Sequence, residues 1–149
     1  MKPDMTAAAT VTSVARSVVD AAIARHRELP DADAHQVMLY DIAHAASAVE
    51  MCRSVIDDGE KGEAEAALAC AFIADVVADL AAKLLGREHL WGVAYGALDS
   101  TREFLATYRD PEFLASLASL NPPSHLDDDF EMVADTFRRF AEDKIAPIA

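Results

Sequence analysis

Apolar side chains recur every three or four residues along most of this chain, which is the period of a helix with one buried face. Over residues 6–28 this repeat predicts a first helix, which Pro30 ends. A second helix is predicted to begin at Asp33, because Asp33 and Gln36 have the spacing of a capping box. Its buried side alternates steps of four and three, as in helical bundles, over Met38, Ile42, Ala45, Val49, Cys52 and Ile56.

A third helix is predicted over residues 63–85, after a charged turn between two glycines at 59–62. Between residues 66 and 85 its charges are Asp75, Asp79 and Lys83, which lie four apart and form one narrow polar stripe. We expect this stripe to face solvent, with Asp79 paired to Lys83, and the rest of the helix to be the centre of the bundle. The apolar side chains predicted to be buried there are Leu68, Phe72, Ile73, Val76, Val77, Leu80 and Leu84. Truncation of Phe72 is expected to be among the most costly single changes.

Shorter helices are predicted beyond a C-cap at Gly86 and a looser stretch at 87–98. Ser100 and Glu103 have capping-box spacing and predict a helix to about Tyr108. Asp110 followed by a proline predicts the start of another short helix.

The clearest break in the chain is the Asn-Pro-Pro-Ser segment at 121–124, because two adjacent prolines exclude helix. Acidic residues 127–129 then predict the start of a last helix. We therefore expect two parts, a helical bundle over residues 1–121 and a linker with one helix over residues 122–149. With no alternating strand pattern, the predicted fold class is all-α, an antiparallel up-and-down bundle of four to five helices.

The chain carries 26 acidic against 13 basic residues among its 149, a formal net charge of −13. Such a charge repels nucleic acids and anionic membrane surfaces, so neither is expected as a partner. The N-terminal residues show no signal-peptide pattern, and no run of about 18 uncharged apolar residues predicts a membrane span. Cys52 and Cys70 follow the helical repeat without metal-ligand spacing, so we expect small buried side chains and a reducing, cytoplasmic location.

Candidate chemical groups are few. Asp41 and His44 share one helix face with Glu50 two turns on, but a di-iron bundle needs two Glu-x-x-His motifs and two further glutamates. The glycines at 86 and 92 do not have the spacing of a phosphate-binding loop. Trp91 could line a ligand pocket, although a cap over the end of the bundle, with its indole N–H bound to a carbonyl, is favoured. The remaining histidines follow no ligand spacing: His26, His35, His89 and His125.

Residues 129–149, with the sequence DFEMVADTFRRFAEDKIAPIA, closely resemble the opening helix of acyl-CoA dehydrogenases, the flavoenzymes that desaturate acyl-CoA thioesters. Residues 35–86 are similar to the long helix pair of the C-terminal bundle of that family, through the segments 40–46, 50–53 and 84–86. The resemblance implies a piece of a larger FAD-dependent flavoprotein, with a degenerate helical domain ahead of the start of an enzyme. The rest of that protein or a second subunit is the implied partner, and a homo-oligomer is expected.

The chain departs from the family where the family performs its chemistry. Arg109 and Asp110 are present, but Pro111 follows where many members have a Glu-Gly-Thr region with the catalytic base. The Arg-x-Phe-Gly segment and the flavin-binding β-domain are absent, and Arg139-Phe140 does not substitute because it lies in the opening-helix segment. No catalytic, cofactor-binding or metal residue is therefore assigned to any position here. The alternative function is a non-enzymatic helical bundle for self-association or partner binding.

Overall fold

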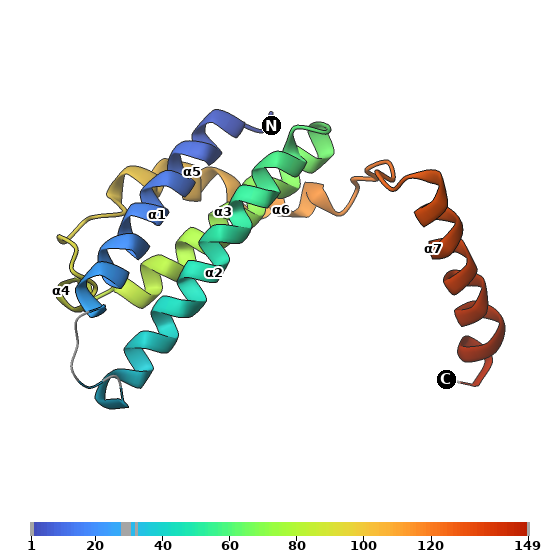
Figure 1. Ribbon diagram of the computed structural model, residues 1–149. Helices are drawn as coiled ribbons and strands as arrows, with labels where there is room; N and C mark the ends of the chain where they lie inside the picture. Colours follow the sequence, from blue (N-terminus) through green and yellow to red (C-terminus); the bar gives the residue numbers. More distant parts are fainter. Residues whose placement is uncertain (1, 28–30, 32, 149) are drawn as a thin grey trace.

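Three long antiparallel helices form the centre of the protein. In the computed structural model, which describes residues 2–27, 31 and 33–148, they are α1 (Met5–His26), α2 (Gln36–Gly59) and α3 (Glu63–Leu84), as Figure 1 shows. None of the described residues forms a strand. The predicted all-α antiparallel bundle is thus confirmed. The expected end of the first helix at Pro30 lies outside the described residues.

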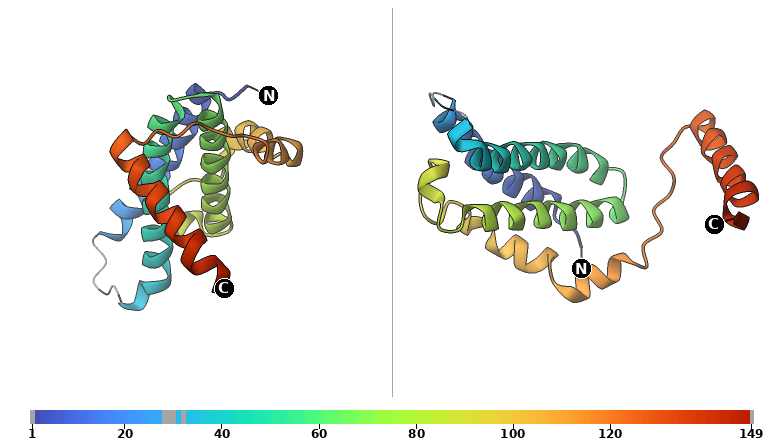
Figure 2. Two further views of the ribbon diagram at one scale, coloured as in Figure 1. Left: turned by 90° about the vertical axis from the view of Figure 1, so that its right-hand side faces the viewer. Right: turned by 90° about the horizontal axis from the view of Figure 1, so that it is seen from below.

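Shorter helices cover the bundle after α3. The turn α4 (Glu88–Trp91) packs on α1, while α5 (Arg102–Tyr108) and α6 (Pro111–Leu117) pack on α3, with the 3-10 turn η2 (Asp99–Thr101) before α5. Figure 2 shows α5 and α6 running along one side of the three long helices. The last helix, α7 (Asp128–Phe140), continues through a π turn (Ala141–Ile145) and a 3-10 turn (Ala146–Ile148), and stands apart from the bundle.

Each long helix buries one row of side chains that alternates steps of three and four. This is the repeat by which helices pack nearly antiparallel with interlocking side chains. The buried rows are Ala8, Val11, Ala15, Val18 and Ala22 on α1; Met38, Ile42, Ala45, Val49 and Cys52 on α2; and Ala66, Cys70, Ile73, Val77, Leu80 and Leu84 on α3. Alanine at every second position of the α1 row lets its backbone approach its neighbours closely.

The orientation of α3 is partly as predicted. Asp75 and Asp79 are exposed, and Asp79 pairs with Lys83, so the polar stripe does face solvent. The predicted burial of Leu68 is wrong, since it is 42% exposed, and Phe72 is only partly buried. The reason is that residues 68, 72, 75 and 79 share one helix face, so the solvent side continues past the charges into apolar positions.

Two of the predicted helix starts are wrong. The capping box at Asp33 is wrong: Asp33 lies in a 3-10 turn (η1, Asp33–His35), and Asp31 accepts the N–H groups of Asp33 and Ala34 at 3.1 and 3.2 Å. The box at Ser100 is also wrong, because α5 begins at Arg102 and its N-cap is Thr101, which makes no side-chain cap hydrogen bond.

The other predicted helix ends are confirmed. Asp110 accepts the N–H groups of Glu112 and Phe113, and Asp127 accepts that of Phe130 at 3.0 Å. Beyond α3, Gly86 has φ +75° and occupies the third position of a type II turn, which the N–H of Arg87 closes by bonding the carbonyl of Leu84 at 2.7 Å. Glycine suits this position because left-handed backbone strains other residues.

Helix α1 is long and apolar enough, by length and composition, to cross a membrane, with a mean hydropathy of 1.3 over its best window. Core helices of soluble proteins and N-terminal signal sequences meet the same criterion. Here 39% of that window is buried inside the bundle. The expected absence of a membrane segment and the cytoplasmic location stay predictions.

Two leucines on α3 test the packing in a matched pair. Leu80 is 1% exposed and Leu68 is 42% exposed, so the same truncation removes very different amounts of buried surface. Leu80→Ala should lower the free energy of unfolding by about 2–5 kcal/mol, whereas Leu68→Ala should cost about 1 kcal/mol or less. Urea denaturation followed by circular dichroism measures both. Equal losses would mean that α3 is oriented differently.

Removal of the last helix tests whether it belongs to the core. A chain ending at Ser124 loses α7, which has no buried residue, and therefore keeps every side chain of the core cluster. We expect the thermal unfolding transition of the bundle to stay within a few degrees of that of the full chain, because the change costs little buried area. Loss of a cooperative transition on truncation would show that α7 is integral to the core.

Candidate functional site

The most conspicuous surface is the apolar face of α7. Phe130, Val133, Phe137 and Phe140 follow steps of three, four and three and so lie on one side of the helix. They are between 48% and 70% exposed, and no residue of α7 is buried. The helix itself is well specified, with Asp127 as its cap, acidic residues in its first turn and arginines in its last. A regular helix therefore presents an aromatic face that nothing in the described structure covers.

A hydrogen bond ties the linker before α7 to the bundle. His125 Nε2 lies 2.6 Å from Oε1 of Glu65, whose side chain is 5% exposed in the first turn of α3. The Glu65 carboxylate folds over Gly62, where a Cβ would overlap it. The hydrogen bond from His125 is the main cause that lowers the pKa of Glu65 below its usual value. Sequence reasoning missed this pair, because its members are 60 residues apart and follow no motif.

The residues that the sequence suggested for a metal site do not converge on one point, because each of them contacts a different side chain. Asp41 pairs with Arg87 at 2.9 Å, the ring of His44 lies against that of Tyr40 with centroids 4.2 Å apart and a tilt of 42°, and Glu50 pairs with Arg16 and Arg53. Among the residues that the structure describes, no group of three or more potential ligands could hold a metal ion. The carboxylates Asp75 and Asp79 likewise diverge, to Arg109 at 3.1 Å and to Lys83.

Trp91 and the two cysteines are buried in the core. Trp91 is fully buried beside α1, but the predicted hydrogen bond from its indole N–H is wrong, because Nε1 has no partner in the described structure. Cys52 and Cys70 are buried, as predicted, and do not form a disulfide. Burial raises the pKa of Cys52 to about 11, so this thiol is held in its unreactive protonated form.

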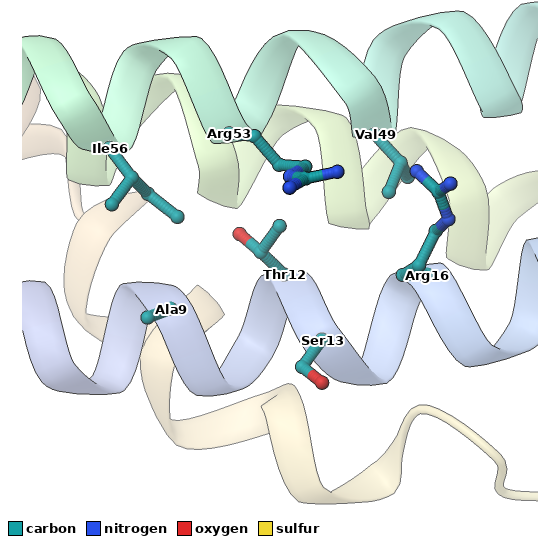
Figure 3. A pocket seen from close by; sticks show the side chains of 7 residues that line it. All are labelled: Ala9, Thr12, Ser13, Arg16, Val49, Arg53 and Ile56. Carbon is teal, nitrogen blue, oxygen red and sulfur yellow. The ribbon is translucent and has the colours of Figure 1, made fainter.

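A groove of about 350 Å³ runs between α1 and α2. Figure 3 shows Thr12 and Arg53 facing each other across it, Arg16 beside Val49 at one end, and apolar side chains at the other. Its lining residues are Ala9, Thr12, Ser13 and Arg16 from α1, and Val49, Arg53 and Ile56 from α2.

The arginines of this groove have hydrogen-bond partners, whereas the hydroxyl of Thr12 has none among the described residues. Glu50 accepts from Arg16 Nη1 and, at 3.3 Å, from Arg53 Nη1, and the hydrogen bond from Arg16 is the main cause that lowers the pKa of Glu50. Arg16 also bonds Asp20 at 3.2 Å. Thr12 is 5% exposed, and its hydroxyl has no hydrogen-bond partner among the described residues.

Comparisons with protein-family models, with curated proteins and with solved structures found no match to this chain. Its function is therefore argued from the contacts of its own residues. These offer two surfaces, the aromatic face of α7 and the groove between α1 and α2.

The hydrogen bond from His125 predicts a pH response that NMR can follow. In the folded protein the pKa of Glu65 lies below its unfolded value of about 4.3, so the stabilising contribution is present above that value and is lost as pH falls through the folded pKa. In His125→Ala we expect the pKa of Glu65 to rise. The pKa is measured from the ¹³C chemical shift of its side-chain carboxyl carbon as a function of pH. Glu50 serves as the control, because its pKa is lowered by Arg16 and should not change. An unchanged pKa of Glu65 in His125→Ala would show that His125 does not stabilise the carboxylate.

Proposed function

We propose that this chain is a non-catalytic helical part of an FAD-dependent flavoprotein similar to acyl-CoA dehydrogenases. In this proposal α7 is the helix through which the bundle joins the flavin-bearing part. The observation that supports it is the uncovered aromatic face of α7, which is formed by Phe130, Val133, Phe137 and Phe140. The same residues belong to the segment that resembles the opening helix of that family.

The energetics of α7 favour a covering partner. A phenylalanine side chain gains about 1.5–3 kcal/mol on full burial, so three of them provide a substantial driving force for association. A contiguous exposed apolar face of this kind marks an interaction site on a folded protein. The role of the bundle is then mechanical: it carries α7 on the linker that follows α6, and the chemistry belongs to the covering partner.

The alternative is that α7 pairs with α7 of a second copy, which would make the chain a self-association module. Ala134 and Ala141 flank the aromatic face, and small side chains there would let two helices approach closely. The net charge of −13 works against this alternative, because two copies repel each other. The flavoprotein proposal therefore comes first.

Isolation of the natural polypeptide distinguishes the two functions. An affinity tag ahead of Met1, placed on the chromosomal copy, should recover a polypeptide longer than 149 residues with the visible spectrum of bound FAD. The 149-residue chain alone, mixed with excess FAD, should leave the spectrum of free flavin unchanged. A recovered polypeptide of 149 residues that is free of flavin and dimeric by light scattering would favour self-association instead.

A matched pair of variants tests the face itself. Phe137 is 70% exposed on the aromatic side of α7, whereas Met132 is 64% exposed outside that face. In the tagged natural protein, Phe137→Asp should reduce the FAD recovered per polypeptide severalfold, because a buried carboxylate would oppose the packing of α7. Met132→Asp introduces the same charge outside the aromatic face and should retain FAD. Equal FAD content in both variants would contradict a role for this face.

A further inference from the structure

The groove between α1 and α2 has the features of a ligand site that is independent of α7. We infer that it binds small carboxylates with an apolar body, with the carboxylate at Arg16 and Arg53 and the body along Ala9 and Ile56. The argument rests on the charges, the walls and one unsatisfied hydroxyl of this groove.

The cationic end already holds a carboxylate of the protein itself. Glu50 lies between Arg16 and Arg53, which come from different helices, so the two guanidinium groups are spaced to share one carboxylate. Each guanidinium has five N–H donors, and the contacts described leave donors free on both. An incoming carboxylate can therefore take the place of Glu50, whose side chain is 55% exposed and free to turn into solvent.

The charge balance selects a monoanion. Exchange of one carboxylate for another keeps the charge around Arg16 and Arg53 constant. A doubly charged phosphate in place of the Glu50 carboxylate would add a second negative charge beside Asp20, in a protein that already carries a net charge of −13.

The other end of the groove provides apolar walls. Ala9 from α1 and Ile56 from α2 lie at this end, and Val49 lies near the arginines (Figure 3). The volume of about 350 Å³ falls within the range of small-molecule sites. A ring or short chain of about six carbons attached to the carboxylate would remove these walls from water.

Thr12 supplies the observation that the fold alone does not explain. Thr10, on the same helix, donates its hydroxyl to the carbonyl of Thr6 at 2.9 Å, whereas the hydroxyl of Thr12 has no partner although the residue is 5% exposed. An unpaired buried hydroxyl is destabilising. Threonine in a helix populates two χ1 rotamers, so a rotation would present this hydroxyl to a ligand oxygen in the groove.

The test uses two probes of the same shape on the full chain. Cyclohexanecarboxylate should shift the backbone amide NMR signals of Thr12 and Arg53 with saturation, and cyclohexanecarboxamide, which lacks the charge, should bind at least about tenfold more weakly. Raising the salt concentration should weaken the binding of cyclohexanecarboxylate but not that of cyclohexanecarboxamide. Equal binding of the two probes, or no saturable shift with either, would overturn the inference.

Three variants separate this site from a structural ion pair. Glu50→Gln removes the internal competitor and should tighten carboxylate binding severalfold, whereas Arg53→Gln should weaken it by roughly tenfold. Thr12→Val should weaken binding while raising the midpoint of unfolding, because it deletes an unpaired buried hydroxyl. Weaker binding in Glu50→Gln, or a Thr12→Val variant that binds unchanged, would contradict the proposed arrangement. Circular dichroism confirms that each variant is folded.

Discussion

The close approach of α1 to α2 and α3 is the constraint on which the rest of this structure depends. Ala8, Ala15 and Ala22 recur every seven residues on the buried side of α1, with valines between them. Small side chains there bring the helix backbones together and leave little room for rearrangement, since dense packing penalises both voids and added volume. Small side chains also lie beside this row, at Ala9 and Ser13. Because neither fills the space toward α2, the groove remains open there.

The two ends of the chain satisfy their apolar surfaces in different ways. The bundle covers its own core, and its charged residues form pairs at the surface, as Asp75 does with Arg109. The helix α7 is equally regular but leaves its aromatic side uncovered. His125 connects the two parts by binding Glu65 at the start of α3. Local capping is therefore sufficient to define the course of α7, whereas its packing requires something outside the helix.

The sequence predicted what depends on local pattern. Periodicity located the three long helices and the buried row of α2, and the proline pair located the break before α7. It could not show which neighbouring rows of an apolar helix face solvent, so Leu68 and Phe72 were assigned to the core. The capping box at Asp33 failed because Asp31 accepts the N–H of Asp33, and the box at Ser100 failed because a 3-10 turn, Asp99–Thr101, precedes α5.

Contacts between distant segments were beyond the reach of sequence patterns. Arg16 and Glu50 are 34 residues apart, and no sequence motif links them. The groove that Arg16 lines exists only once α1 lies against α2, so no spacing of residues indicated it. The sequence likewise did not indicate the unpaired hydroxyl of Thr12, because threonine within a helix ordinarily bonds a backbone carbonyl.

The burial of Trp91 gives the protein an intrinsic optical reporter. It is the sole tryptophan of the chain, it is fully enclosed beside α1, and α4 lies at the end of the bundle away from α7 (Figure 1). An indole in an apolar site without a hydrogen-bond acceptor emits at shorter wavelength than one in water. The wavelength of the fluorescence emission therefore reports whether this end of the bundle stays packed around Trp91. Binding at α7 should leave it unchanged.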